Sequence, residues 1–392
     1  MERHEVHLGF FVDDKSDLKH VDFLRSNSAS LKFSFASPLK QKISSLKGFL
    51  TGTSLTENAY PSGSMRKFTS QLVQNKQIDA VFLYSAATHT FLPKEMNDIP
   101  IVTDFVDVDS AKWEAYAESN SWPMNAIFRR EGAKLASFES YVAARSAASI
   151  LVSDDEAALM GNRLADRKGL SQQLTARTPK LIQPLGITNG VDSGMFSPEK
   201  YAKNAKIKRL IFTGAMDYAP NIEAVAWFVD RVFPRLKRDY PEIEFVIAGR
   251  PVAPAVQKLD MHVGVSVIGA VDDMAETIAA ATIVVAPMLT ARGIQNKVLE
   301  GMAMAKPVVA TSAANEGINA PDREALWVAD SADAFVDAVK ALMDSSLANK
   351  MGHAARQFVL DNFNWDKSCA ALETLLNEVT TRKANGKSGA SE

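Results

Sequence analysis

Short apolar runs alternate with stretches of helical periodicity along the whole chain. The runs are rich in Val, Ile and Phe and show little polar alternation, which is typical of strands buried on both faces of a parallel sheet. Between them lie amphipathic helical stretches, such as Asn221 to Phe233 and Val298 to Ala305. The pattern predicts an α/β protein with parallel sheets. The predicted strands are Val6 to Val12, Ile78 to Tyr84, Ile99 to Val106, Ala148 to Val152, Arg209 to Thr213, Ile243 to Ala248, Val265 to Ile268, Ile283 to Ala286 and Pro307 to Thr311.

A change of composition divides the chain into two halves of similar size. Turn-forming pairs, among them Asn189-Gly190 and Ser197-Pro198, cluster before the charged stretch from Lys200 to Arg209. A second series of alternating strands and helices follows. With 392 residues, the chain has the length of two ordinary domains. We therefore predict two α/β domains joined by a linker, with a ligand-binding cleft between them.

Composition and charge narrow the class of protein. The chain is 46% hydrophobic and 23% charged, which argues against global disorder, and its net charge of −2 gives no bulk electrostatic case for binding nucleic acid. The single cysteine, Cys369, excludes an intramolecular disulfide and a cysteine-rich zinc site, and its apolar surroundings predict a buried side chain. No signal peptide and no long apolar run is evident, so we expect a cytoplasmic protein.

Several segments resemble glycosyltransferase family 4 in the order in which they occur. These segments are Ile187 to Asp192, Phe196 to Pro198, the block from Pro287 to Ala310, and Phe363 to Trp365. Three further segments resemble one subgroup, the exosortase/PEP-CTERM-associated bacterial sugar transferase; they are Phe212 to Tyr218, Asp104 to Ser110, and Ala291 to Lys297. The ordered set covers nearly the whole chain and is more specific than any one segment.

The resemblance implies a GT-B fold, in which two Rossmann-like, doubly wound parallel-sheet domains face a cleft. It assigns residues 1–187 to an acceptor-side domain, 188–208 to a linker, and 209–362 to a nucleotide-sugar-binding domain. Residues 363–380 would form a helix returning to the first domain, and 381–392 a disordered tail. In the subgroup, a first strand and a Gly-containing loop precede the segment matched by His4 to Asp14. We therefore expect the first strand-helix unit to be missing, through a late start codon, a truncation or a local rearrangement, and activity to be weak.

The block from Ala291 to Glu300 carries the most chemistry. It runs from a buried strand through a glycine turn into a helix, whose N-terminus presents free N–H groups and partial positive charge to a diphosphate. Arg292 and Lys297 add cations, and the resemblance assigns the ribose hydroxyls to Glu300. Each of these three charges could also be an ordinary surface or ion-pair residue. The residues expected to bind the donor are Gly214, Asp217, Asn221, Arg250, Val271, Gly293, Ile294, Asn296 and Glu300.

The chain also departs from the family pattern. Arg292 occupies the place of a family glutamate that contacts the donor sugar, and Ala215 and Asn221 stand where many members carry an Arg and a Lys for the diphosphate. Arg292 and Lys297 are the nearest substitutes, so we expect them to be catalytic. Asn221 and Asp217 could instead serve as helix caps.

Acidic residues follow a predicted strand of the first half. Asp104, Asp107 and Asp109 stand at the carboxyl end of that strand, where ligands approach open α/β sheets. We expect Asp107 to be catalytic and Asp104 and Asp109 to face the acceptor, with capping or turn formation as the alternative for each. The resemblance requires no metal and no cofactor. Trp122, Arg129, Arg130 and Glu131 could also face the acceptor, or form a solvated face.

The resemblance implies a retaining, hexosyltransferase-like enzyme. It would move a sugar from a nucleoside diphosphate sugar to a hydroxyl acceptor, a glycan or a lipid-linked sugar, in bacterial exopolysaccharide or glycolipid biosynthesis. Peripheral association with the inner face of the plasma membrane stays open, although no helix is basic enough to argue it from the sequence. The alternatives are a non-catalytic nucleotide- or sugar-binding GT-B component of a polysaccharide assembly complex, and a GT-B sugar-nucleotide epimerase, which the linker and the Glu300 block fit poorly.

Overall fold

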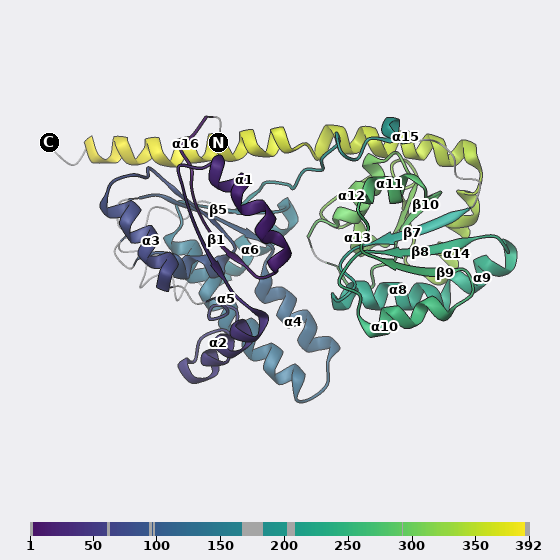
Figure 1. The fold of residues 1–392 in the computed structure, drawn as a ribbon, viewed down its shortest axis with the longest axis horizontal. Coiled ribbons are helices and arrows are strands. Elements are labelled where there is room, and N and C mark those ends of the chain that lie inside the picture. Colours follow the sequence, from purple (N-terminus) through teal and green to yellow (C-terminus); the bar gives the residue numbers. More distant parts are fainter. Residues whose placement is uncertain are drawn as a thin grey trace. The chain divides into compact units, whose positions relative to one another are not determined.

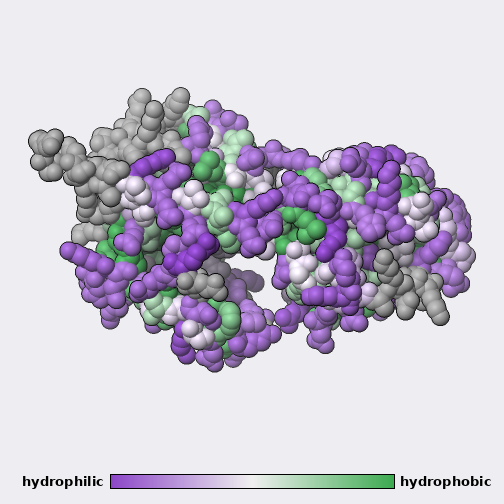
Figure 2. Space-filling view, turned by 90° about the horizontal axis from the view of Figure 1, so that it is seen from above, coloured by the Kyte–Doolittle hydropathy of each residue, from purple (hydrophilic) through white to green (hydrophobic). Residues whose placement is uncertain are grey.

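The computed structural model describes residues 3–60, 63–93, 96, 99–166, 183–201, 208–291 and 293–388. The chain divides into two compact units, which are described separately. The first comprises Met1–Gly186 and Glu373–Glu392, and the second Ile187–Leu372. Figure 1 shows the elements of both units, and the face of the protein seen in Figure 2 is mostly hydrophilic, with hydrophobic residues in small separate patches.

The second unit is built on one parallel sheet of six strands in the order β12-β11-β10-β7-β8-β9. Its strand sequences are almost entirely apolar, so both faces must be covered, and helices lie on both sides of the sheet (Figure 1). The strands are β7 (Arg209–Thr213), β8 (Glu244–Ala248), β9 (Val265–Gly269), β10 (Ile283–Ala286), β11 (Val308–Ala310) and β12 (Trp327–Val328).

Helices of the second unit connect its parallel strands along the chain. Helix α8 begins at Ala219 with Pro220 in its first turn, where a missing N–H costs nothing. The sequence placed this start two residues later. The helices are α8 (Ala219–Arg231), α9 (Phe233–Asp239), α10 (Pro254–Gln257), α11 (Met274–Ala279), α12 (Asn296–Ala303), α13 (Ser312–Asn315), α14 (Ala332–Ala341) and α15 (Ser345–Asn362), with the short 3-10 turns η3 (Pro198–Lys200) and η4 (Lys258–Met261).

The first unit has its strands in two separate parallel sheets. One pairs β1 (His7–Val12) with β2 (Ser30–Phe35), and the other has the order β3-β4-β5-β6. Among the described residues, no backbone pairing joins the two sheets. The strands of the second sheet are β3 (Val81–Tyr84), β4 (Ile101–Val106), β5 (Ala148–Leu151) and β6 (Leu185–Gly186).

The first unit departs from the predicted pattern at one of its strands. Strand β2 was not predicted, because its polar and apolar residues alternate as in a half-exposed strand, whereas the predicted strands are continuous apolar runs. The helices are α1 (Val21–Ser26), α2 (Pro38–Thr51), α3 (Gly63–Gln74), α4 (Asp109–Ser119), α5 (Met124–Arg145) and α6 (Asp154–Asp166), with the 3-10 turns η1 (Lys15–His20) and η2 (Ala86–Phe91).

The last helix, α16 (Trp365–Ser388), belongs partly to each unit, with its residues from Glu373 onward grouped with the first. It continues past residue 381, where the sequence predicted a disordered tail, because extending an existing helix adds one hydrogen bond for each residue ordered. Cys369 is exposed on this helix, so the prediction that it is buried was wrong. Within the described ranges, no helix has both the length and the apolar character needed to cross a membrane.

Candidate functional site

Glycines bring three strand ends of the second unit close together at the carboxyl edge of the sheet. Gly214 follows β7 with φ of 151°, Gly249 follows β8 with φ of 130°, and Gly269 ends β9 with φ of 66°. A Cβ atom on Gly249 would lie 1.9 Å from the carbonyl oxygen of Gly214. Only glycine permits this approach, so the edge presents bare backbone where a ligand of an open α/β sheet would bind.

Helix α12 lies directly against the sheet beside this edge. A Cβ atom on Gly301 would stand 2.9 Å from Cγ2 of Val284 on β10, and Val298, Leu299 and Met302 are fully buried. Gly293, with φ of 63°, turns the chain into the helix. The apolar face of α12 therefore holds it in place, and its first turns carry Lys297 and Glu300, one turn apart.

Lys297 is a buried cation. Its side chain is only 9% exposed, its Nζ donates to Oε1 of Gln295 at 3.0 Å, and the same atom lies 5.3 Å from the ring centre of Phe212. A Cβ atom on Gly214 would lie 3.4 Å from its Cε. Burial lowers the pKa of Lys297 to about 8, opposed by the charge of Glu300. A desolvated ammonium beside open backbone is well placed to receive an anion.

Glu300 is the partly buried acid of the same helix. Burial raises the pKa of its carboxyl to about 7, and the ammonium of Lys297 opposes that rise. Because the charge of each group shifts the pKa of the other, the two groups titrate as a coupled pair. As a carboxylate, Glu300 can accept hydrogen bonds from two hydroxyl groups at once.

Asn221 joins Lys297 beside Gly214. It is buried on the first turn of α8, its Nδ2 donates to the carbonyl of Ala215 at 2.9 Å, and that nitrogen would lie 2.8 Å from a Cβ on Gly214. Its Oδ1, like Oγ1 of Thr213, is buried with no hydrogen-bond partner among the described residues. Beside Gly214, the amide oxygen of Asn221 is therefore an unsatisfied acceptor, and the hydroxyl of Thr213 can donate as well as accept. Thr213 was not predicted, because a hydroxyl within an apolar strand gives no sequence signal.

The capping roles considered for α8 do not occur. The residue at the cap position is Tyr218, whose side chain makes no capping hydrogen bond. Asn221 lies inside the helix, and Asp217 is exposed in the preceding turn.

The other predicted donor residues lie around this edge with differing exposure. Arg250 follows Gly249 and is exposed, and Val271 follows β9 and is half-buried. Ile294 packs against the core of the unit, whereas Asn296 is exposed at the first residue of α12. Arg292 lies outside the described residues. The structure thus brings Gly214, Asn221 and Lys297 together, with Glu300 one turn beyond Lys297 on α12.

The three predicted aspartates of the first unit do gather at one strand end. Asp104, at the end of β4, accepts from the N–H of Val106 at 2.8 Å, and burial raises its pKa to about 6. Asp109 begins α4, and burial raises its pKa as well. The charge of Asp107 raises both pKa values further, so the three carboxyls share one region. No group of three or more His, Cys, Asp or Glu is arranged to hold a metal ion among the described residues.

Two buried acids that the sequence did not single out fix this loop. Glu156 accepts from the N–H of Val108 at 2.7 Å, and Glu139 accepts from the N–H of Ser110 at 3.0 Å and from its hydroxyl. Burial raises the pKa of Glu139 to about 7. A carboxylate among the buried apolar positions of a helix was the available signal, since Leu135, Phe138 and Val142 surround Glu139 on α5.

Some candidates in the first unit have structural roles instead. The carboxylate of Glu131 is fully buried and bonded to the loop after α2, and Arg130 donates to backbone carbonyls there, so neither forms a solvated face. His89, which the sequence did not single out, packs against the rings of Phe138 and Tyr141, and burial lowers its pKa to about 4. Trp122 is exposed.

Comparison with known proteins places these features in context. Residues 207–345 match the family described as glycosyl transferases group 1. A glycosyltransferase from Rickettsia africae ESF-5 is 13% identical, with a TM-score of 0.59 over 96% of this chain and 99% of that one. Sucrose-phosphate synthase from Thermosynechococcus elongatus is 14% identical, with a TM-score of 0.56 over 82% and 81% of the two chains.

A third solved structure was determined with ligands. The Anabaena protein HepE, in complex with UDP and glucose, is 12% identical, with a TM-score of 0.54 over 97% of this chain and 98% of that one. No curated protein matches the sequence. The chain has the two-domain, Rossmann-like α/β GT-B fold of these structures, and its residues 207–345 resemble the glycosyl transferases of group 1.

Proposed function

We propose that the protein is a retaining glycosyltransferase that moves a sugar from a nucleoside diphosphate sugar to a hydroxyl acceptor. The observation that carries the proposal is the pair of Lys297 and Glu300, a buried cation and a partly buried acid beside the open backbone of Gly214. The group 1 match over residues 207–345 supports it, as does the shared fold with HepE, whose structure contains UDP.

In this proposal the second unit holds the donor. The ammonium of Lys297 and the first N–H groups of α12 neutralise the diphosphate, and Glu300 accepts from the ribose hydroxyls. Stabilising the charge that develops on the departing diphosphate is the main catalytic contribution, with Arg292 as the second cation. Retention at the anomeric carbon comes from the family resemblance.

The acceptor belongs to the first unit in this proposal. Asp107 contacts the reacting hydroxyl, and Asp104 and Asp109 orient the acceptor. Exopolysaccharide or glycolipid biosynthesis in the bacterial cytoplasm, at the inner face of the plasma membrane, follows from the same resemblance. No step requires a metal or a cofactor.

The test is a calorimetric titration of the full chain with UDP, GDP and ADP, beside Glu300→Gln and the control Glu242→Gln. Glu242 is an exposed acid just before β8, at the opposite edge of the sheet. We expect one nucleotide to bind, about tenfold more weakly to the Glu300 variant and unchanged in the control, because hydrogen bonds to a charged acceptor contribute ~1.5–3 kcal/mol.

Two results would count against the proposal. If Glu300→Gln and the unaltered chain bound the nucleotide with equal affinity, α12 would not form the donor site. Tight nucleotide binding without transfer or hydrolysis of any sugar nucleotide would favour the non-catalytic binding role.

A further inference from the structure

Helix α2 of the first unit, labelled in Figure 1, has apolar side chains that are exposed to solvent. Leu39 is 68% exposed, Ile43 58%, Leu46 57% and Leu50 90%. Their spacing of four, three and four residues places them on one stripe of the helix. Single exposed leucines are ordinary, but a continuous stripe of four along one helix marks a surface that another body covers.

The opposite side of α2, which faces the protein, is small and polar. Gln41, Ser44 and Ser45 are half-buried there, and Gly48 is buried. A Cβ atom on Gly48 would lie 2.7 Å from the carbonyl oxygen of Ser54, so the helix backbone rests directly on the loop that follows it. A helix that merely covered a core would have the reverse arrangement, with its apolar stripe inside.

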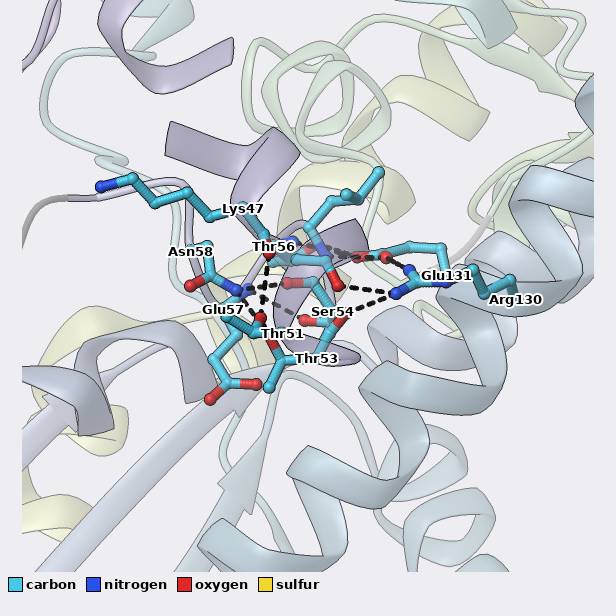
Figure 3. Close-up of polar contacts among 11 residues, drawn as sticks. Lys47, Thr51, Thr53, Ser54, Thr56, Glu57, Asn58, Arg130 and Glu131 are labelled. Carbon is cyan, nitrogen blue, oxygen red and sulfur yellow. Dashed lines mark hydrogen bonds and ion pairs between the residues drawn. The ribbon is translucent and has the colours of Figure 1, made fainter. Parts of the chain in front are cut away.

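Two charged residues of α5 hold α2 and this loop in place (Figure 3). Arg130 donates to the carbonyls of Gly48 at 2.7 Å and Thr53 at 3.1 Å, and Glu131 accepts from the N–H groups of Leu55 and Thr56 at 2.8 and 2.9 Å. The guanidinium of Arg130 also lies 4.7 Å from the ring centre of Phe49. The exposed stripe is therefore presented by a fixed helix.

Charge along α2 indicates what the stripe contacts. Its sequence contains lysines and no acidic residue. At about 100° per residue, the exposed Lys42 and Lys47 fall on opposite sides of the stripe. An apolar stripe flanked by cations, on a helix lying flat against its own protein, matches the boundary between lipid headgroups and acyl chains of an anionic membrane.

We propose that α2 docks the protein onto an anionic phospholipid surface, with Ile43, Leu46 and Leu50 entering the acyl boundary and Lys42 and Lys47 contacting headgroup phosphates. The sequence had yielded no such helix. Which side of α2 faces the protein is decided by Gly48, Arg130 and Glu131, and this makes the leucine stripe the outer side.

The experiment is flotation of the full chain with vesicles of phosphatidylcholine alone or with about one-third phosphatidylglycerol. The variants are Leu46→Ser/Leu50→Ser, Lys42→Gln/Lys47→Gln, and the control Met261→Ser/Val263→Ser, which removes two highly exposed apolar side chains from the second unit. We expect binding to the anionic vesicles to fall about tenfold or more in the leucine variant. In the lysine variant we expect binding to these vesicles to fall about fivefold for each lysine replaced, and in the control we expect no change.

The assay needs no nucleotide, so its outcome is independent of the proposed transferase activity. Because the substituted side chains are already exposed, thermal unfolding of the variants should match that of the unaltered chain. Failure of the chain to float with anionic vesicles, or equal flotation of the leucine variant, would overturn the proposal. The proposal would also be overturned if light scattering showed that the unaltered chain is a dimer and the leucine variant a monomer, since a second copy of the chain would then cover the stripe.

Discussion

The two units bury their strands to different degrees. In the second unit, β7, β8 and β10 are buried almost completely and belong to one continuous core. In the first unit, β3 leaves Phe82 and Tyr84 exposed, and the apolar core is divided into separate clusters. The first unit also contains buried acids that order its loops. Glu131, Glu139 and Glu156 each accept hydrogen bonds from backbone N–H groups of a neighbouring loop.

The two units therefore differ in the interactions that hold their helices and loops in place. In the second unit, apolar packing against the sheet positions α12, and Arg356 adds a hydrogen bond to the carbonyl of Ala303 at the end of that helix. The first unit relies more on hydrogen bonds to buried carboxylates, which leave an unsatisfied donor behind if one partner is lost.

The largest expected effect tests the packing of the second unit. Phe245→Ala should lower the free energy of unfolding by ~3–5 kcal/mol, since this fully buried ring packs against Phe228 and Phe233. Phe82→Ala, a matched change on the exposed strand of the first unit, should cost less than about 1 kcal/mol. Urea unfolding followed by fluorescence measures both, and similar losses would contradict the contrast between the units.

A smaller effect is expected from the polar network of the first unit. Glu131→Ala should cost about 2 kcal/mol, because the partly buried N–H groups of Leu55 and Thr56 lose their acceptor. Glu118→Ala, an exposed acid on α4, serves as the control. Hydrogen exchange of residues 53–56 gives the readout, and unchanged protection there would show that Glu131 does not order the loop.

The smallest effect concerns pH and the donor site. Lys297, with a pKa of about 8, loses its charge as pH rises, so nucleotide affinity should fall by up to about fivefold from pH 8 to 9. Below pH 7 protonation of Glu300 should weaken binding again, because its carboxyl pKa is about 7. Calorimetry across this range should show an optimum between these values, and Lys297→Met should abolish the loss at high pH. A flat profile for the unaltered chain would exclude Lys297 as the cation that binds the diphosphate.

The sequence was most informative where both faces of a strand are covered. It placed β7 and β10 at their observed bounds, because a short run of β-branched apolar residues such as Ile283 to Ala286 favours a buried strand. The same reasoning located α12 and its charged residues within two positions. It missed β2, whose alternation marks a half-exposed strand, and Arg292 lies outside the described residues.

What the sequence by itself determined is the α/β class and the segment that carries Lys297 and Glu300, since both follow from local apolar periodicity and motif order. Only the tertiary structure decided that Asn221 and Lys297 converge on Gly214, and that Glu131 is a buried anchor. It also decided that α2 turns its leucines outward. These properties depend on which side of a helix meets another element, and periodicity along the chain defines the two sides of a helix without saying which one is covered.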